Sequence, residues 1–191
     1  MSEDTPIRAS DRIRASAREL FYREGIRAVG VDEIVHKAGV TKPSLYRSFP
    51  SKDELAAAYL RDYDLEFWVN FETPGGQAYD DPREHVLAYI GGLASRAVKT
   101  GYRGCGLTNA MVEYPSREHP ARQVSEEHKK KFRKRLRELA AAMGAKNPDQ
   151  LGDGLLLLIE GIYVTGQLSE DGPSESALAM ATLLIDASLA A

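Results

Sequence analysis

The stretch "GVTKPSLYRSFPSKDEL", from Gly39 to Leu55, contains a turn, a short helix and the start of another helix. Before it, residues 31–38 carry apolar side chains at helical spacing, and Gly39 is typical of a helix end. Thr41 is a favourable N-cap for a short helix that ends near Phe49. Two short helices joined by a turn containing glycine predict a helix-turn-helix motif over about residues 29–48.

The short helix after the turn has an inward and an outward side. Leu45 and Phe49 lie four residues apart, so both are expected to face inward. The other side chains then have the placement of a recognition helix, which reaches base edges and phosphates in the major groove. The predicted DNA contacts are Thr41, Lys42, Pro43, Ser44, Tyr46, Arg47 and, at the start of the next helix, Lys52.

Helical signals continue in both directions, which predicts an all-α protein of about nine helices. The first helix is expected to begin near Thr5-Pro6 or at Ser10 and to end at Gly25, and Ser51 with Glu54 forms a capping box for the fourth. Residues 73–82 are a linker candidate. The expected later helices are Arg83–Lys99, Leu107–Tyr114, Pro120–Met143, Pro148–Leu168 and Pro173–Leu189.

Bulk properties exclude several classes of protein. The 191 residues carry a net charge of −3, so a DNA-binding role must rest on local geometry and not on overall charge. No apolar run is long enough to span a membrane, and the acidic N-terminus does not resemble a signal peptide. The single cysteine, Cys105, rules out an intramolecular disulfide framework. We therefore expect a cytoplasmic protein without a membrane partner.

The N-terminal third resembles a known family. The residues that carry the resemblance are Leu20-Phe21, Gly25, Val31, Ile34, Ala38 to Lys42, Leu45 to Arg47, Phe49 to Lys52 and Leu55. Together they resemble the DNA-binding domain of the TetR, or AcrR-type, family of bacterial transcriptional regulators. The resemblance implies a DNA-binding domain over residues 6–66 and an effector-binding and dimerisation domain over residues 67–191. The chain departs from the family pattern at Val29-Gly30-Val31, where many members have a Ser or Thr that contacts a phosphate.

The C-terminal part holds a group of aromatic residues and polar neighbours that could line an apolar ligand pocket. Each of them alone can equally be a plain core residue. Around Cys105 the chain is similar to the effector domain of one TetR subgroup. This similarity does not identify a ligand. The candidate pocket residues are Tyr63, Phe67, Trp68, Phe71, Tyr89, Cys105, Asn109, Met111, Tyr114, His128 and Tyr163.

The last two predicted helices are apolar on more than one face, which favours a four-helix dimer interface across a two-fold axis. A simple monomer core is the alternative. A dimer would also present two recognition helices to two operator half-sites. The candidate interface residues are Leu155, Leu158, Ile159, Ile162, Gly166, Leu178, Ala181, Leu184 and Ile185.

Two further patterns compete with this interpretation. Residues 129–137 hold seven cations in nine positions, which suggests either a second nucleic-acid patch or, as we favour, a solvated helix face with ion pairs. Cys105 and the histidines could suggest an enzyme, but their spacing fits neither a nucleophile with its base nor a metal site. We expect no catalysis, no metal and no cofactor.

The sequence therefore predicts a homodimeric, sequence-specific DNA-binding regulator, with a repressor favoured over an activator. A small molecule of unknown identity would release it from operator DNA. The alternatives are a DNA-binding regulator without an effector and a helical interaction module that does not bind DNA.

Overall fold

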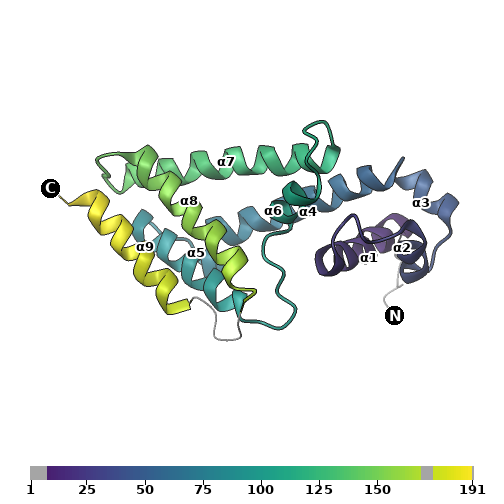
Figure 1. Ribbon diagram of the computed structural model, residues 1–191, viewed down its shortest axis with the longest axis horizontal. Helices are drawn as coiled ribbons and strands as arrows, with labels where there is room; N and C mark the ends of the chain where they lie inside the picture. The colour runs from purple at the N-terminus through teal and green to yellow at the C-terminus, as the bar shows by residue number, and fades with distance from the viewer. Residues whose placement is uncertain (1–7, 169–173, 191) are drawn as a thin grey trace, which may run out of the picture. The chain divides into compact units, whose positions relative to one another are not determined.

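The computed structural model describes residues 8–168 and 174–190, and all regular structure in these residues is helical. The predicted all-α class is confirmed, with nine α-helices in the described part of the chain. The possible helix starts at Thr5-Pro6 and Pro173 lie outside it. The elements are α1 (Ala9–Glu24), α2 (Val31–Ala38), α3 (Lys42–Ser48), α4 (Lys52–Glu72), η1 (Pro74–Gly76), α5 (Pro82–Ala97), α6 (Gly106–Glu113), α7 (Pro120–Ala142), α8 (Pro148–Thr165) and α9 (Ser174–Leu189) (Figure 1).

The chain reverses direction at positions that the sequence marks clearly. Gly25 ends α1 with φ 94° and Gly39 ends α2 with φ 61°, a backbone region that glycine adopts without a steric penalty. The Thr41 hydroxyl accepts a hydrogen bond from the Ser44 N–H at 3.4 Å, and the Ser51 hydroxyl accepts one from Glu54 at 3.1 Å. These caps satisfy backbone donors that the first turns of α3 and α4 would leave unpaired.

Helices α1, α2 and α3 pack against one another around a small apolar core. Ile13 from α1, Ile34 from α2 and Leu45 from α3 are fully buried there. Removing such side chains from water stabilises the fold by roughly 1.5–3 kcal/mol each. The three helices therefore form one rigid support for the outward face of α3.

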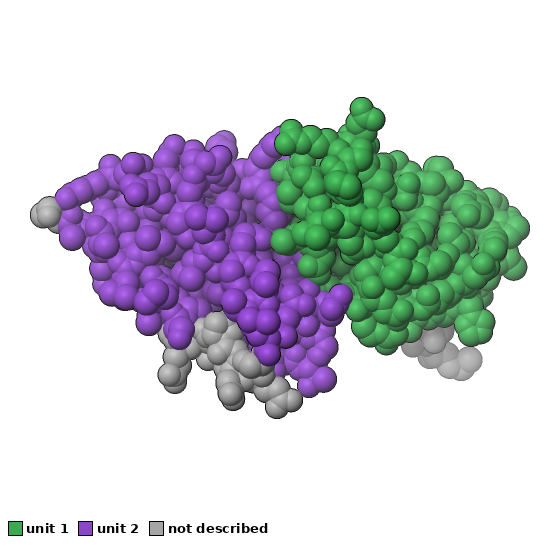
Figure 2. Space-filling view, in the orientation of Figure 1, with its two compact units in different colours: residues 1–63, 106–126 green, residues 64–105, 127–191 purple. Residues whose placement is uncertain are grey.

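The chain divides into two compact units (Figure 2). Unit 1 comprises residues 1–63 and 106–126, and unit 2 comprises residues 64–105 and 127–191. The divisions fall inside α4 and inside α7, so both helices run from one unit into the other. The expected domain boundary lay at residue 66, and residues 106–126 were expected in the C-terminal effector-binding and dimerisation domain.

Unit 2 is built from α5, α8 and α9, which pack against one another, and from the unit-2 parts of α4 and α7. Its centre is aromatic: the rings of Phe71 and Phe132 are 5.0 Å apart, and those of Phe71 and Tyr89 are 4.8 Å apart. Gly152 lets α8 approach α7, because an added Cβ would lie 2.7 Å from the Arg137 backbone nitrogen. None of the described helices is long and apolar enough to cross a membrane.

Candidate nucleic-acid interface

The short helix α3 presents one face to its own unit and the other to solvent. Leu45 is fully buried and Phe49 is 6% exposed, so the predicted inward pair is confirmed. Tyr46 is 49% exposed although it is a large aromatic residue, and Arg47 beside it is exposed as well. An exposed tyrosine next to an exposed arginine offers an apolar ring, a hydroxyl and a forked cation to an incoming surface.

A hydrogen-bonded chain organises the N-terminal end of α3. The hydroxyls of Thr41 and Ser44 lie 3.1 Å apart, and Arg47 donates from Nη2 to the Ser44 hydroxyl at 2.9 Å. Pro43 occupies the first turn, where its missing N–H removes no helical hydrogen bond. The only described hydrogen bond of Arg47 is thus the one to the Ser44 hydroxyl. Its other guanidinium N–H groups have no described partner.

Lys42 is paired with an acid on the preceding helix. Its Nζ lies 2.7 Å from Oδ1 of Asp32, and this carboxylate raises the pKa of the lysine. Both side chains are largely exposed. A surface pair of this kind contributes little free energy, so a phosphate can replace the carboxylate as the partner of Lys42.

Lys52 has a different environment from the other predicted contacts. Its Nζ donates to the carbonyl of Val29 at 2.6 Å and to that of Arg27 at 3.3 Å, and burial lowers its pKa. The lysine therefore ties the start of α4 to the loop before α2, with one N–H left for a phosphate. Val29 is 1% exposed, so its side chain belongs to the core.

One residue in unit 1 was missed by sequence reasoning. Oε2 of Glu113, at the end of α6, accepts a hydrogen bond from the backbone N–H of Arg27 at 2.8 Å. The Arg27 guanidinium donates in turn to the Glu113 carbonyl at 3.3 Å. The two residues are 86 positions apart, and no local pattern could have indicated their contact. Glu113 and Lys52 together hold the loop that leads into α2.

The geometry defines a helix-turn-helix protein, and comparisons with known proteins give its family. Residues 13–59 match the family model described as bacterial regulatory proteins, tetR family. A TetR-family transcriptional regulator from Streptomyces coelicolor has a similar structure, with a TM-score of 0.89 and 30% identity. That likeness covers 95% of this chain and 96% of the Streptomyces chain.

Two curated relatives from Mycolicibacterium smegmatis match over the N-terminal part. The transcriptional activator FasR is 50% identical over 46 residues, which are 24% of this chain and 21% of FasR. The transcriptional repressor KstR2 is 33% identical over 66 residues, which are 33% of this chain and 32% of KstR2. The matches thus span about a fifth and a third of the length of these two relatives.

Because the likeness to the Streptomyces coelicolor protein extends over nearly both whole chains, this protein belongs to the TetR family. It is a DNA-binding transcriptional regulator.

Seven of the eleven candidate pocket residues lie in unit 2, and the structure brings them together. The Phe67 ring lies 4.4 Å from the His128 ring and 6.0 Å from the Tyr89 ring. The Tyr89 and Tyr163 hydroxyls are hydrogen-bonded at 2.8 Å, and burial raises the pKa of Tyr89. The seven residues are Phe67, Trp68, Phe71, Tyr89, Cys105, His128 and Tyr163.

The other four candidates, Tyr63, Asn109, Met111 and Tyr114, belong to unit 1. Tyr63 stacks on Tyr22 with ring centroids 6.4 Å apart, and Tyr114 stacks on His119 at 3.7 Å. Burial raises the pKa of Tyr114 to about 12. These contacts give Tyr63 and Tyr114 packing roles within unit 1.

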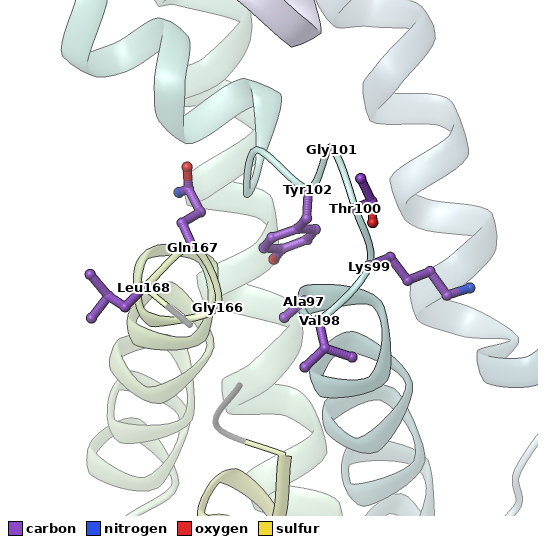
Figure 3. A pocket seen from close by; sticks show the side chains of 9 residues that line it. All are labelled: Ala97, Val98, Lys99, Thr100, Gly101, Tyr102, Gly166, Gln167 and Leu168. Atoms are coloured by element: carbon purple, nitrogen blue, oxygen red, sulfur yellow. The ribbon is translucent and has the colours of Figure 1, made fainter. Parts of the chain in front are cut away.

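Unit 2 also has an open cavity of about 530 Å³ at the C-terminal ends of α5 and α8 (Figure 3). The ring of Tyr102 lies between the two helix ends, while the ammonium of Lys99 points away from it. Gly166 is needed there, because an added Cβ would lie 2.4 Å from the Ala97 Cβ. The lining residues are Ala97, Val98, Lys99, Thr100, Gly101, Tyr102, Gly166, Gln167 and Leu168, and none of the candidate pocket residues is among them.

The candidate interface residues on α8 and α9 are mostly buried within the protomer. Five of them are at most 2% exposed: Leu155, Ile159, Ile162, Ala181 and Ile185. Gly166 is buried as well. Leu158 and Leu184 are half-buried, and Leu178 is 37% exposed. The large apolar residues that these helices expose are others: Leu157 and Val164 on α8, Leu168 just beyond it, and Met180 and Leu183 on α9.

Six of the seven cations in the basic run on α7 form ion pairs with acids of the chain, in line with the preferred interpretation. Arg133 and Arg137 both pair with Asp153, and Arg135 pairs with Glu72 at 2.8 Å. The two arginines hold the pKa of the Asp153 carboxyl well below its usual range. Three lysines of the run are paired as well: Lys129 with Glu160, Lys131 with Glu127, and Lys134 with Glu138.

The cysteine and the histidines have separate partners. Cys105 is 1% exposed, and its sulfur lies 3.9 Å from the Lys129 ammonium. His85 contacts the Phe71 carbonyl at 2.7 Å, and His119 lies 3.4 Å from Asp53. Within the described residues no group of three or more His, Cys, Asp or Glu side chains could hold a metal ion.

Proposed function

We propose that the protein binds operator DNA as a homodimer through the outward face of α3, and that a small molecule bound in unit 2 releases it. The observation that carries this proposal is the exposure of Tyr46 and Arg47 on a short helix whose inward residues are fully packed. Thr41, Lys42 and Ser44 would position the helix on the phosphates, Pro43 would offer an apolar surface to a thymine methyl, and Arg47 would read a base edge.

The dimer follows from the demands of DNA reading and from an exposed apolar surface. Two recognition helices must meet successive major grooves about 34–36 Å apart, which one short helix cannot do alone. Leu157, Val164 and Leu168 follow one another at spacings of seven and four, so they share one face of α8 and its extension. Gly161 lies between them on that face, where an added Cβ would meet nothing within 4 Å. Together with Met180 and Leu183, these residues supply the apolar centre of a dimer interface to which each copy contributes two helices.

Release from DNA by an effector favours a repressor over an activator, because ligand binding then removes the protein from its operator. One curated relative is an activator and another a repressor, so the sign of regulation rests on this argument alone. The unit-2 cavity and the buried polar groups around Tyr163 and His128 support a ligand in that unit.

The test begins with selection of a binding sequence from a randomised pool of DNA duplexes. We expect a palindromic sequence bound at least about 10³-fold more tightly than random duplex, since specific sites commonly reach that ratio. Leu157→Asp should give a monomer on a sizing column and lose the palindromic preference, whereas Glu127→Gln on the solvent side of α7 should remain dimeric. A selected pool with no preferred sequence would contradict the proposal.

A further inference from the structure

His128, near the middle of α7, has one nitrogen without a partner. Its side chain is 1% exposed, and Nδ1 lies 2.6 Å from Oδ1 of Asp64. Nε2 is buried and has no hydrogen-bond partner in the described structure. Buried polar atoms are nearly always hydrogen-bonded, so an unsatisfied one in a native fold indicates a missing partner.

The protonation state of His128 decides what kind of partner that is. Burial, followed by the charge of Lys129, lowers the pKa of His128 to about 4, although Asp64 opposes this shift. The imidazole is therefore neutral near pH 7, with a single ring proton. The Asp64 carboxylate only accepts hydrogen bonds, so the proton resides on Nδ1. Nε2 then carries a lone pair and requires a donor.

The surroundings of the ring are aromatic and lie close to the surface of unit 2. The ring of Phe67 meets His128 edge-on at 4.4 Å, and the rings of Trp68 and Phe132 are each 5.9 Å away. Asp64 and Trp68, one turn apart on α4, are only half-buried. The imidazole itself is buried, so a ligand reaches it only when neighbouring side chains move.

The neighbouring charges limit the ligand further. The ammonium of Lys129 is already paired with Glu160 and lies 5.6 Å from the Tyr163 ring centroid. A charged ligand of either sign would have to lose its hydration beside Nε2, and burial is also the largest cause of the lowered pKa of His128. Both signs of charge are thus unfavourable at Nε2.

We propose that His128 Nε2 is the hydrogen-bond acceptor of the effector site, and that the effector is an uncharged molecule with a hydroxyl or N–H donor on an aromatic or aliphatic body. This inference rests on the proposed function, because it names the chemistry of the same effector. Asp64 is a positioning residue, since it fixes the tautomer and the orientation of the ring. The aromatic side chains around the ring would pack on the body of the molecule.

The probes for the test are 4-butylphenol, its methyl ether and 4-butylbenzoate, which share a body and differ in the polar group. Trp68 is the only tryptophan of the chain and lies beside His128, so its fluorescence reports binding there. We expect the phenol to bind the wild-type protein about tenfold or more tightly than the ether, which cannot donate to a buried acceptor. We expect the benzoate to bind more weakly than the phenol.

Two variants separate the roles of the two ring nitrogens. His128→Asn keeps a donor near the Nδ1 position for Asp64 but has no acceptor at the Nε2 position. His128→Gln keeps an acceptor near the Nε2 position. The phenol should lose its preference over the ether in the Asn variant and retain part of it in the Gln variant. Circular dichroism and thermal unfolding of both variants check that the fold is intact.

A second readout needs neither variant. Nitrogen NMR of the histidine-labelled wild-type protein at neutral pH should give an unprotonated Nε2 for His128, with a signal that moves when the phenol is added. The inference is overturned by a protonated Nε2, by equal affinities for phenol and ether, by tighter binding of the benzoate, or by no saturable binding of any probe. Release from DNA is measured in a separate assay. A phenol that binds beside Trp68 without releasing the protein from DNA would contradict the proposed function but not the assignment of the His128 site.

Discussion

Helices α3 and α7 both carry exposed cations, but the surroundings of those cations differ. On α7, Arg133 and Arg137 share the Asp153 carboxylate, and Arg135 pairs with Glu72. On α3, Arg47 bonds only to the Ser44 hydroxyl among its described contacts. Most cations of the longer basic run are therefore paired with acids, while Arg47 on the short helix is not. Whether cations are paired, more than how many there are, thus indicates a surface for DNA.

The largest effect on DNA binding is expected from Arg47→Ala. An arginine that reads a base edge contributes about 1–3 kcal/mol, so affinity for the selected operator should fall by roughly fivefold to 150-fold. Fluorescence anisotropy with the selected duplex measures the loss. Affinity for random duplex should change much less, and an equal loss on both DNAs would reduce Arg47 to a phosphate contact.

A smaller effect is expected when the support of α2 and α3 is weakened. Glu113→Ala removes the carboxylate that accepts the Arg27 N–H, a contact of about 1 kcal/mol for a partly exposed group. Thermal unfolding should occur about 2–4 °C lower in a chain of this size, and operator affinity should fall severalfold.

The matched control for Glu113→Ala is Glu118→Ala, since Glu118 is an exposed acid in the following loop. It should leave both the melting temperature and operator affinity unchanged. If both variants bind the operator like the wild type, Glu113 does not contribute to the position of α3 for DNA binding.

Asp32→Asn tests whether Lys42 can exchange its carboxylate for a phosphate. The change frees Lys42 and removes a negative charge beside the recognition helix. Operator affinity should rise severalfold at low salt, because Lys42 no longer has to leave a carboxylate before it binds a phosphate and a repelling charge is removed. Unchanged affinity would mean that Lys42 stays away from the DNA backbone.

The smallest effect is expected on α7. Arg133→Ala should change operator affinity by less than about twofold, because its charge is already balanced by Asp153. A competition assay against the wild-type protein on the same duplex resolves such a difference. A loss as large as that of Arg47→Ala would break the distinction between the two helices.

Local signals allowed most of the fold to be predicted from the sequence. Gly25, Gly39, Thr41 and Ser51 each fix a helix end through backbone conformation or a side-chain cap, and all four are confirmed. The predicted outward position of Tyr46 and Arg47 followed from the four-residue spacing of Leu45 and Phe49.

Features that depend on distant contacts could not be predicted. The link between Glu113 and Arg27 has no local signal, and neither does the pairing of Lys52 with the Val29 carbonyl. The five apolar residues from Leu155 to Ile159 face every side of α8, so periodicity could not separate a core residue such as Leu155 from an exposed one such as Leu157. The interface residues therefore remain a prediction, now centred on the exposed set.

Two double variants with the same net charge test whether α3 or bulk charge carries DNA recognition. One is Lys42→Ala with Arg47→Ala, and the other is Arg133→Ala with Lys134→Ala. The affinity of each for operator and for random duplex is measured by anisotropy across a salt series. We predict that the α3 variant loses the preference for operator and flattens the salt slope by up to about two units. The α7 variant should match the wild type in both, and equal losses in the two variants would mean that bulk charge and not α3 carries recognition.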